Sequence, residues 1–127
     1  YKEFFRCLTK NGVMTHQIDY QCHETAYEWN GHWKYPSWFW AMMRGRLPWF
    51  INRRPHSVHC KLQDKAGFLI CKEDLDERPS QLAKNQLSRD FVSLSDRDLN
   101  TAGAMFVSRK QEVPITPSFS QGRADHA

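Results

Sequence analysis

Motifs of known enzyme classes are missing from this chain of 127 residues. It has no G-x-S-x-G, no glycine-rich loop of the kind that cradles a phosphate and no H-E-x-x-H. The acids of "KEDLDE" (72–77) follow an expected strand, where a cluster of charges is typical of a solvated turn. His59 and Cys60 would face opposite sides of a strand and make no nucleophile–base pair. We therefore predict a protein without enzymatic activity.

Paired cysteine spacing is also missing. Cys7, Cys22, Cys60 and Cys71 are spread widely along the chain, and the sequence shows no signal peptide. Its longest apolar runs are only a few residues, which is too short to cross a bilayer. We therefore expect free thiols in a reducing compartment, namely the cytoplasm, and no membrane partner.

Zinc-ligand residue types are present without the usual zinc-ligand spacing. A structural zinc site usually shows a C-x-x-C or an H-x3-5-H pair, and the chain has neither. In an expected strand, alternation would also separate His59 from Cys60. We expect no metal, no other cofactor and no small-molecule ligand. The residues of these types are Cys22, His23, His32, His56, His59, Cys60 and Cys71.

Aromatic residues, in contrast, are abundant. They make up 13% of the chain, and most of its tryptophans fall within "NGHWKYPSWFWAMMRGRLPWF", residues 30–50. A basic segment without any acid, residues 44–61, overlaps this stretch in a chain of formal net charge +4. Trp, Met and Arg are enriched at the centres of protein interfaces. The combination indicates a surface that contacts a partner.

The aromatic stretch predicts a helix over residues 36–45. A proline suits its first turn, and a glycine suits the position just past its end. Trp38 and Met42 lie one helical turn apart, and a second apolar pair with the same spacing follows. A helix that is apolar nearly all round is buried or covered by a partner. We expect Trp38 and Met42 to point inward and Trp40 to point outward.

The remaining patterns predict an α+β fold with a small antiparallel sheet. Two alternating runs around the polar turn "QDKAG" predict a central hairpin over about residues 57–72. Two or three short helices would pack on this sheet in a single domain, residues 1–110, followed by an extended tail, residues 111–127. The other expected elements are a helix within residues 1–10, a strand over 16–22, a helix from about Pro79, a helix capped by Ser95 and a last strand over 104–110.

The order of motifs between residues 18 and 72 carries a resemblance. "QIDYQC" precedes an aromatic loop, the helix opening "YPSW" and the expected hairpin. This order resembles small phage and prophage proteins of unassigned function, in which a strand I-x-A-x-Q precedes a helix opening W/Y-P-x-W. The family's T-L-E-G hairpin turn reads "QDKAG" here. The resemblance implies a phage-encoded protein in the host cytoplasm and no known activity. The matching positions are Ile18, Tyr20, Gln21, Trp29, Tyr35, Pro36 and Trp38.

These features together predict a small interaction protein that docks onto a larger protein assembly. In this hypothesis the tryptophans are apolar anchors, and the arginines are charged contacts at the rim. The alternative is an RNA or single-stranded nucleic-acid binding protein, including a ribosome-associated one, since arginine attracts phosphates and aromatic rings stack on bases. No RNP, KH or zinc-finger pattern accompanies the basic segment. The expected contact residues are Trp38, Trp40, Trp49, Arg44, Arg46, Arg53 and Arg54.

Overall fold

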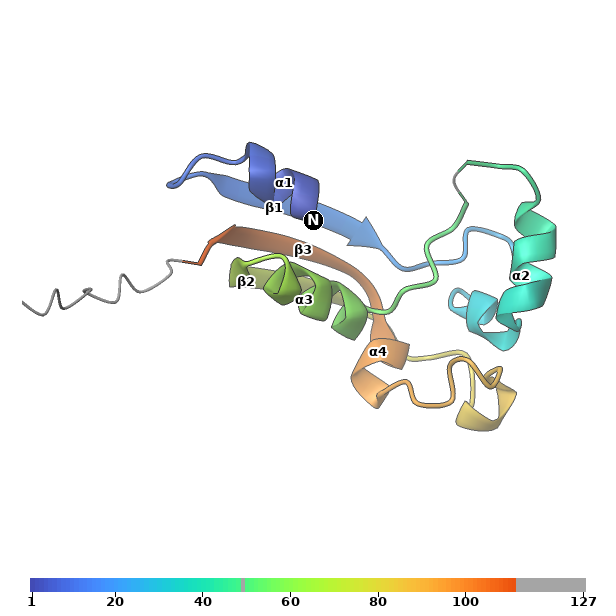
Figure 1. Ribbon diagram of the computed structural model, residues 1–127. Helices are drawn as coiled ribbons and strands as arrows, with labels where there is room; N and C mark the ends of the chain where they lie inside the picture. Colours follow the sequence, from blue (N-terminus) through green and yellow to red (C-terminus); the bar gives the residue numbers. More distant parts are fainter. Residues whose placement is uncertain (49, 112–127) are drawn as a thin grey trace, which may run out of the picture.

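A three-stranded antiparallel sheet is the centre of the fold (Figure 1). The computed structural model describes residues 1–48 and 50–111. None of the helices in these residues has both the length and the apolar composition that a membrane crossing needs. The elements in chain order are α1 (Lys2–Cys7), β1 (Val13–Asp19), η1 (Gly31–Lys34), α2 (Ser37–Arg44), α3 (His56–Lys65), β2 (Phe68–Glu77), η2 (Lys84–Gln86), α4 (Asp96–Asn100) and β3 (Thr101–Lys110), where η marks a 3-10 helix.

Strand β3 is the middle strand and pairs antiparallel with β1 on one side and with β2 on the other. Its side chains alternate: Ala104 and Phe106 are buried, whereas Met105 between them is exposed. This alternation with a period of two is expected for a sheet that is covered on one face. Helix α3 covers that inner face (Figure 1). Its Cys60 packs against a core cluster formed by Ile18, Tyr20, Ala104 and Phe106.

The register of β2 shifts by one residue at Cys71. Cys71 opposes no residue of β3, as in a β-bulge. Before the bulge, Phe68 and Ile70 lie on the inner face; after it, Glu73 and Leu75 do. Strict alternation without the extra residue would turn Glu73 toward solvent. The bulge therefore places a carboxylate on the face that α3 covers.

A second core lies beyond one end of the sheet and is built mostly from loops and turns. Trp33 in η1 is completely buried there, with Leu82, Leu87 and Leu99 around it. The indole Nε1–H of Trp33 donates to the backbone carbonyl of Arg53 at 3.0 Å, so the one polar atom of this side chain is satisfied. Helix α2 stands beside this second core, away from the sheet (Figure 1).

The α+β class, with an antiparallel sheet and short helices, is confirmed. The helix expected over 36–45 is α2, and the strand expected over 104–110 belongs to β3. Ser95 caps α4 as its spacing predicts, because its hydroxyl oxygen accepts the backbone N–H of Asp98 at 3.0 Å. The extended tail expected after residue 110 lies, from residue 112 on, outside the described residues.

The central hairpin expected over residues 57–72 is wrong. Residues 56–65 form the helix α3, and only the end of the expected range is a strand, the beginning of β2. The buried positions of α3 are His56, His59 and Gln63, which lie on one face of a helix. Because these buried residues are polar, hydrophobicity does not mark the inner face, and the alternating apolar residues between them imitate a strand.

The helix expected from about Pro79 is also wrong. Side chains from other segments hold this part of the chain in turns: the backbone N–H of Ser80 donates to the side-chain carbonyl of Asn100 at 2.7 Å. Further along, the backbone N–H of Ser88 donates to the carbonyl of Trp33 at 3.0 Å. These long-range bonds satisfy backbone groups that a helix would have paired internally. The only helical turn in residues 79–92 is η2.

Candidate docking surface on helix α2

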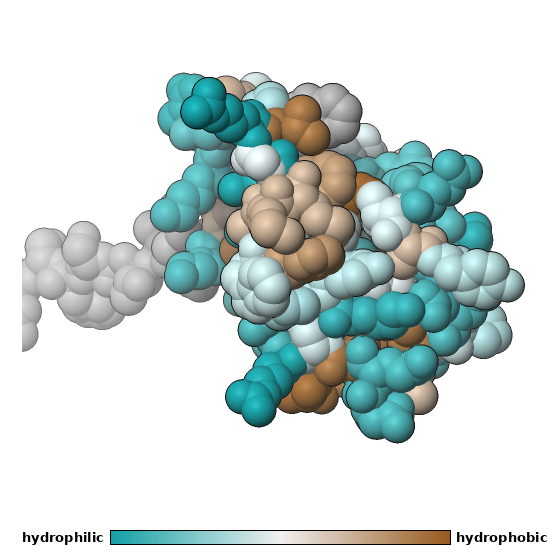
Figure 2. Space-filling view, turned by 90° about the vertical axis from the view of Figure 1, so that its right-hand side faces the viewer, coloured by the Kyte–Doolittle hydropathy of each residue, from teal (hydrophilic) through white to brown (hydrophobic). Residues whose placement is uncertain are grey.

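Helix α2 is apolar and yet largely exposed. Trp40 is its only buried residue. The side chain of Trp38 is 70% exposed, and that of Met42, one turn further on the same side, is 63% exposed. Large apolar side chains that are exposed at neighbouring positions mark interaction sites more often than singly exposed ones. Viewed from the side that carries α2, the molecule shows hydrophobic residues near the centre of the face, with hydrophilic ones around them (Figure 2).

Arginines border these apolar side chains. Arg44 ends α2, and Arg46 follows two residues after it; both are exposed. Gly45 between them has a φ of +55°, a left-handed conformation that suits glycine and turns the chain out of the helix. The sequence has no acid from residue 29 to residue 63, so the charged side chains that α2 and its flanking segments themselves contribute are basic. We call the set the α2 surface; it consists of Trp38, Met42, Met43, Arg44, Arg46 and Leu47.

The amino end of α2 is fixed by a residue that lies far away in the sequence. Ser37 donates its backbone N–H and its hydroxyl to the same carboxylate oxygen of Asp90, at 2.7 and 2.6 Å. The first turn of a helix has unpaired N–H groups and the positive end of the dipole, so a carboxylate stabilises it. The hydrogen bonds from Ser37 hold the pKa of Asp90 below its usual range. Asp90 thus ties α2 to the loop that follows η2.

Beneath α2, Trp40 packs against Arg53. The guanidinium carbon of Arg53 lies 4.8 Å from the ring centroid of Trp40 and 4.5 Å from that of Phe91, so the cation contacts two aromatic rings. The same guanidinium donates to the backbone carbonyl of Tyr35. Burial lowers the pKa of Arg53 to about 10, against the opposing effect of the Asp90 charge. Arg53 therefore stays charged at neutral pH and serves to hold α2 in place.

The expected orientation of α2 is wrong, because the structure reverses it. Trp38 and Met42 point to solvent, and Trp40 points inward. All three side chains are apolar, so the pattern within the helix could not choose its inner side. That choice is made by Arg53, Phe91 and Asp90, which come from other segments.

Of the residues expected to contact a partner, the structure brings some to the α2 surface and not others. Trp38, Arg44 and Arg46 lie on it, and Trp40 and Arg53 lie beneath it. Leu47, which is 54% exposed just past the helix, was not among the expected contacts, and its only signal is that it adjoins the arginines. Arg54 is exposed elsewhere, and Trp49 lies outside the described residues.

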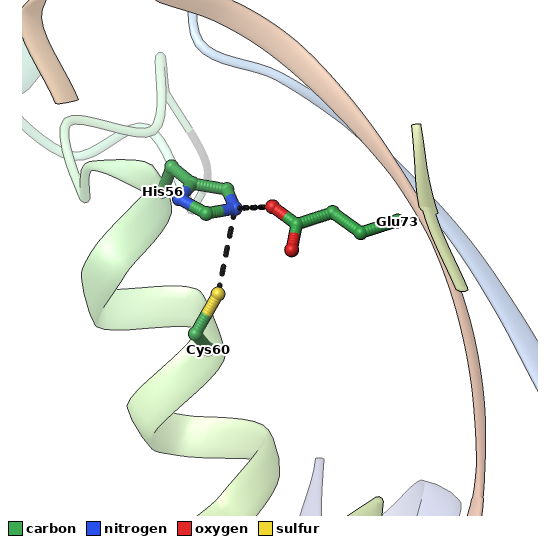
Figure 3. A group of neighbouring side chains, drawn as sticks. All are labelled: His56, Cys60 and Glu73. Carbon is green, nitrogen blue, oxygen red and sulfur yellow. Dashed lines mark hydrogen bonds and ion pairs between the residues drawn. The ribbon is translucent and has the colours of Figure 1, made fainter. Parts of the chain in front are cut away.

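A separate group of side chains carries metal-ligand atoms. His56 and Cys60 lie one turn apart on α3, and Glu73 comes from β2; the three point toward one another (Figure 3). His56 Nε2 lies 3.4 Å from Cys60 Sγ and contacts Glu73 Oε1 directly. The sequence did not indicate this group, because the spacing of His56 and Cys60 brings them together only on a helix.

Comparison with known protein families, with curated protein sequences and with solved structures finds no match for this chain. The resemblance to phage proteins therefore stays a prediction. The case for a function rests on the surface and the side-chain clusters of the chain itself.

Proposed function

We propose that this protein is a non-enzymatic binding module that docks onto a larger protein assembly through the α2 surface. The observation that supports it most is the exposure of Trp38 and Met42, at 70% and 63%, on one side of one helix. Tryptophan and methionine are enriched at interface centres, and tryptophan most often supplies the binding free energy. Laying an apolar helix side into a groove is a recurrent mode of protein recognition.

The partner surface would be an apolar groove with acidic residues at its rim. Full burial of an exposed leucine or methionine side chain is worth about 1.5–3 kcal/mol, and Met42 and Leu47, at 63% and 54% exposed, can contribute the share that is still uncovered. Arg44 and Arg46 would meet acids around the groove and raise the rate of association. Charged contacts at a rim act mainly on the association rate, which falls as salt rises, and contribute little to affinity, so the affinity should depend on salt much less than that of nucleic-acid binding does.

The side chains of the α2 surface support a protein partner better than a nucleic acid. Bases stack on flat aromatic rings, and among the described residues of this surface only Trp38 offers one. Met42 and Leu47 have no ring to stack. Arg53, one of the cations expected to meet phosphates, is engaged inside the protein by Trp40 and Tyr35. Nucleic-acid binding remains the alternative outcome of the test.

Affinity capture from the native host tests the proposal, with the tagged full chain, nuclease treatment and two salt concentrations. The test variant is the double substitution Trp38→Ala/Met42→Ala. The matched control is Tyr27→Ala, which removes a completely exposed aromatic ring outside the α2 surface. We expect the same defined proteins with the wild type and with the control, and their loss with the double variant.

Two results would contradict the proposal. If the captured material is RNA or ribosomal particles that disappear on nuclease treatment or at moderate salt, the surface binds nucleic acid. If the double variant captures the same proteins as the control, another part of the chain makes the contact. Melting temperatures of all three proteins must agree within a few degrees, which confirms that the variants are folded.

A further inference from the structure

We propose that His56, Cys60 and Glu73 form a binding site for a zinc ion between α3 and β2. The three donor atoms, one from each side chain, all lie within 4.8 Å of one another. Imidazole nitrogen, thiolate sulfur and carboxylate oxygen are the three ligand types that zinc takes in proteins. Three protein ligands leave the fourth tetrahedral position for a water molecule.

The site stands on rigid elements rather than on loops. His56 and Cys60 occupy successive turns of α3, and Glu73 reaches the same point because of the bulge at Cys71 (Figure 3). The ring of His56 lies parallel to that of Phe106, at 5.6 Å between centroids and an interplanar angle of 11°. This packing fixes the orientation of the imidazole, so the site needs little rearrangement to take an ion.

The contacts of the three side chains converge on one atom of His56. Cys60 Sγ and Glu73 Oε1 both approach the same ring nitrogen of His56, and that nitrogen carries at most one hydrogen. The neutral Cys60 thiol can also donate its own hydrogen, so donor and acceptor atoms of all three side chains gather at one point, where the His56 side chain is only 5% exposed. A dication at the point where the three atoms converge would satisfy all of them at once.

Thiol catalysis fits the same group less well. In a cysteine–histidine pair the group that orients the imidazole binds the ring nitrogen opposite the thiol. Here the carboxylate and the thiol contact the same nitrogen. The negative charge of the Glu73 carboxylate would attract a metal ion.

Two neighbouring groups suit a bound ion and its water. Tyr20 is completely buried, its ring stands edge-on to His56 with centroids 6.3 Å apart, and its hydroxyl has no hydrogen-bond partner among the described residues. A water on zinc would be a partner of the kind that buried hydroxyls usually have. Arg97 donates to Glu73 Oε1 at 3.2 Å and so orients the carboxylate from outside.

Titration of the full chain with cobalt and then with zinc tests the proposal. Cobalt replaces zinc as a coloured probe, and a thiolate ligand gives it a strong charge-transfer band in the near ultraviolet. We expect one ion per chain, this band, and displacement of cobalt by zinc.

The variants test the ligands one at a time. Cys60→Ser should abolish the band. Glu73→Gln keeps the size of the side chain and should weaken metal binding by at least about 10–100-fold, which is the effect of losing a partner in the outer shell. Cys7→Ser, which removes an exposed thiol that is not part of the group, should change nothing.

The proposal is overturned if the folded wild type binds no zinc at micromolar concentration. It is equally overturned if Cys60→Ser and Glu73→Gln bind zinc as tightly as the wild type, because the ion is then held elsewhere on the chain. Circular dichroism spectra must first show that both variants are folded. Glu73→Gln decides the matter by itself should Cys60→Ser fail to fold. None of these measurements depends on a docking partner.

Discussion

The guanidinium of Arg53 lies against the indole ring of Trp40, with 4.8 Å between its central carbon and the ring centroid. Two residues that the sequence suggests as surface contacts thus bind each other inside the molecule. Their contact attaches α2 to the second core from below and leaves Trp38 and Met42 free on the outer side. The consequences can be measured one residue at a time.

Trp40→Ala should destabilise the protein strongly, whereas Trp38→Ala should hardly change its stability. Trp40 is only 7% exposed, so its truncation leaves a cavity and should lower the free energy of unfolding by about 3–5 kcal/mol. Trp38→Ala should change it by less than about 0.5 kcal/mol, as exposed substitutions usually do. Urea denaturation at pH 7 measures both. A large loss of stability in Trp38→Ala would mean that this ring is packed in solution.

Arg53→Lys should destabilise the protein although the charge is kept. A lysine ammonium is not planar and cannot lie flat between Trp40 and Phe91 while it donates to Tyr35. We expect a loss of about 1–2 kcal/mol in the free energy of unfolding. Arg54→Lys, at the exposed neighbouring position, is the control and should have no effect. Equal stabilities of the two variants would argue against the aromatic contacts of Arg53.

Asp90→Ala should lower the melting temperature by removing the acceptor at the amino end of α2. The pKa of Asp90 is lowered in the folded protein, so its stabilising effect is complete above the unfolded value of about 4 and is lost as the pH falls through the lowered pKa. The difference in melting temperature between the wild type and Asp90→Ala should therefore be present at pH 7 and become smaller in strong acid. Ser37→Ala, which removes only the hydroxyl donor, should show a smaller difference. A difference that does not change with pH would contradict the role of the charge.

His32 should make the protein less stable as the pH falls below about 6.5. Its ring is completely buried, neither ring nitrogen has a hydrogen-bond partner among the described residues, and burial, with a further contribution from Arg53, lowers its pKa to about 3. The unfolded chain takes up the proton at higher pH than the folded one, so stability is full above the unfolded pKa and declines toward acid. Between pH 7 and pH 5 the wild type should lose about 2 kcal/mol more than His32→Phe, which has no group to protonate. Urea denaturation at the two pH values checks this, and parallel losses would exclude His32 as the cause.

The sequence predicts the parts of this fold that have one strong local signal. Gly45 ends α2, Ser95 caps α4, and the strand expected over residues 104–110 belongs to β3. Prediction from the sequence fails at α3. The inner face of this helix consists of His56, His59 and Gln63, so no apolar periodicity marks it. Short runs of this kind are compatible with helix and strand alike, and contacts from distant segments decide between them.

The candidate sites show the same limit. The location of the candidate docking surface, in the aromatic stretch beside the arginines, follows from composition, but its outer side does not, because Asp90 and Phe91 fix α2 from more than forty residues away. The proposed zinc site needs a helix at His56 and a bulge at Cys71 together. Neither has a local signal, and an error of one residue in the register of β2 would turn Glu73 away from the group.

The central position of β3 determines when the sheet can form during synthesis. Both edge strands pair with β3, which is the last of the three in the chain, and Val13 of β1 finds its partner only at Arg109. While the ribosome is still making residues before Thr101, β1 and β2 have no strand of this sheet to pair with, and closing such long loops makes folding slow. A nascent chain stalled before β3 would therefore expose two unpaired strands, which are prone to pair with other chains and aggregate.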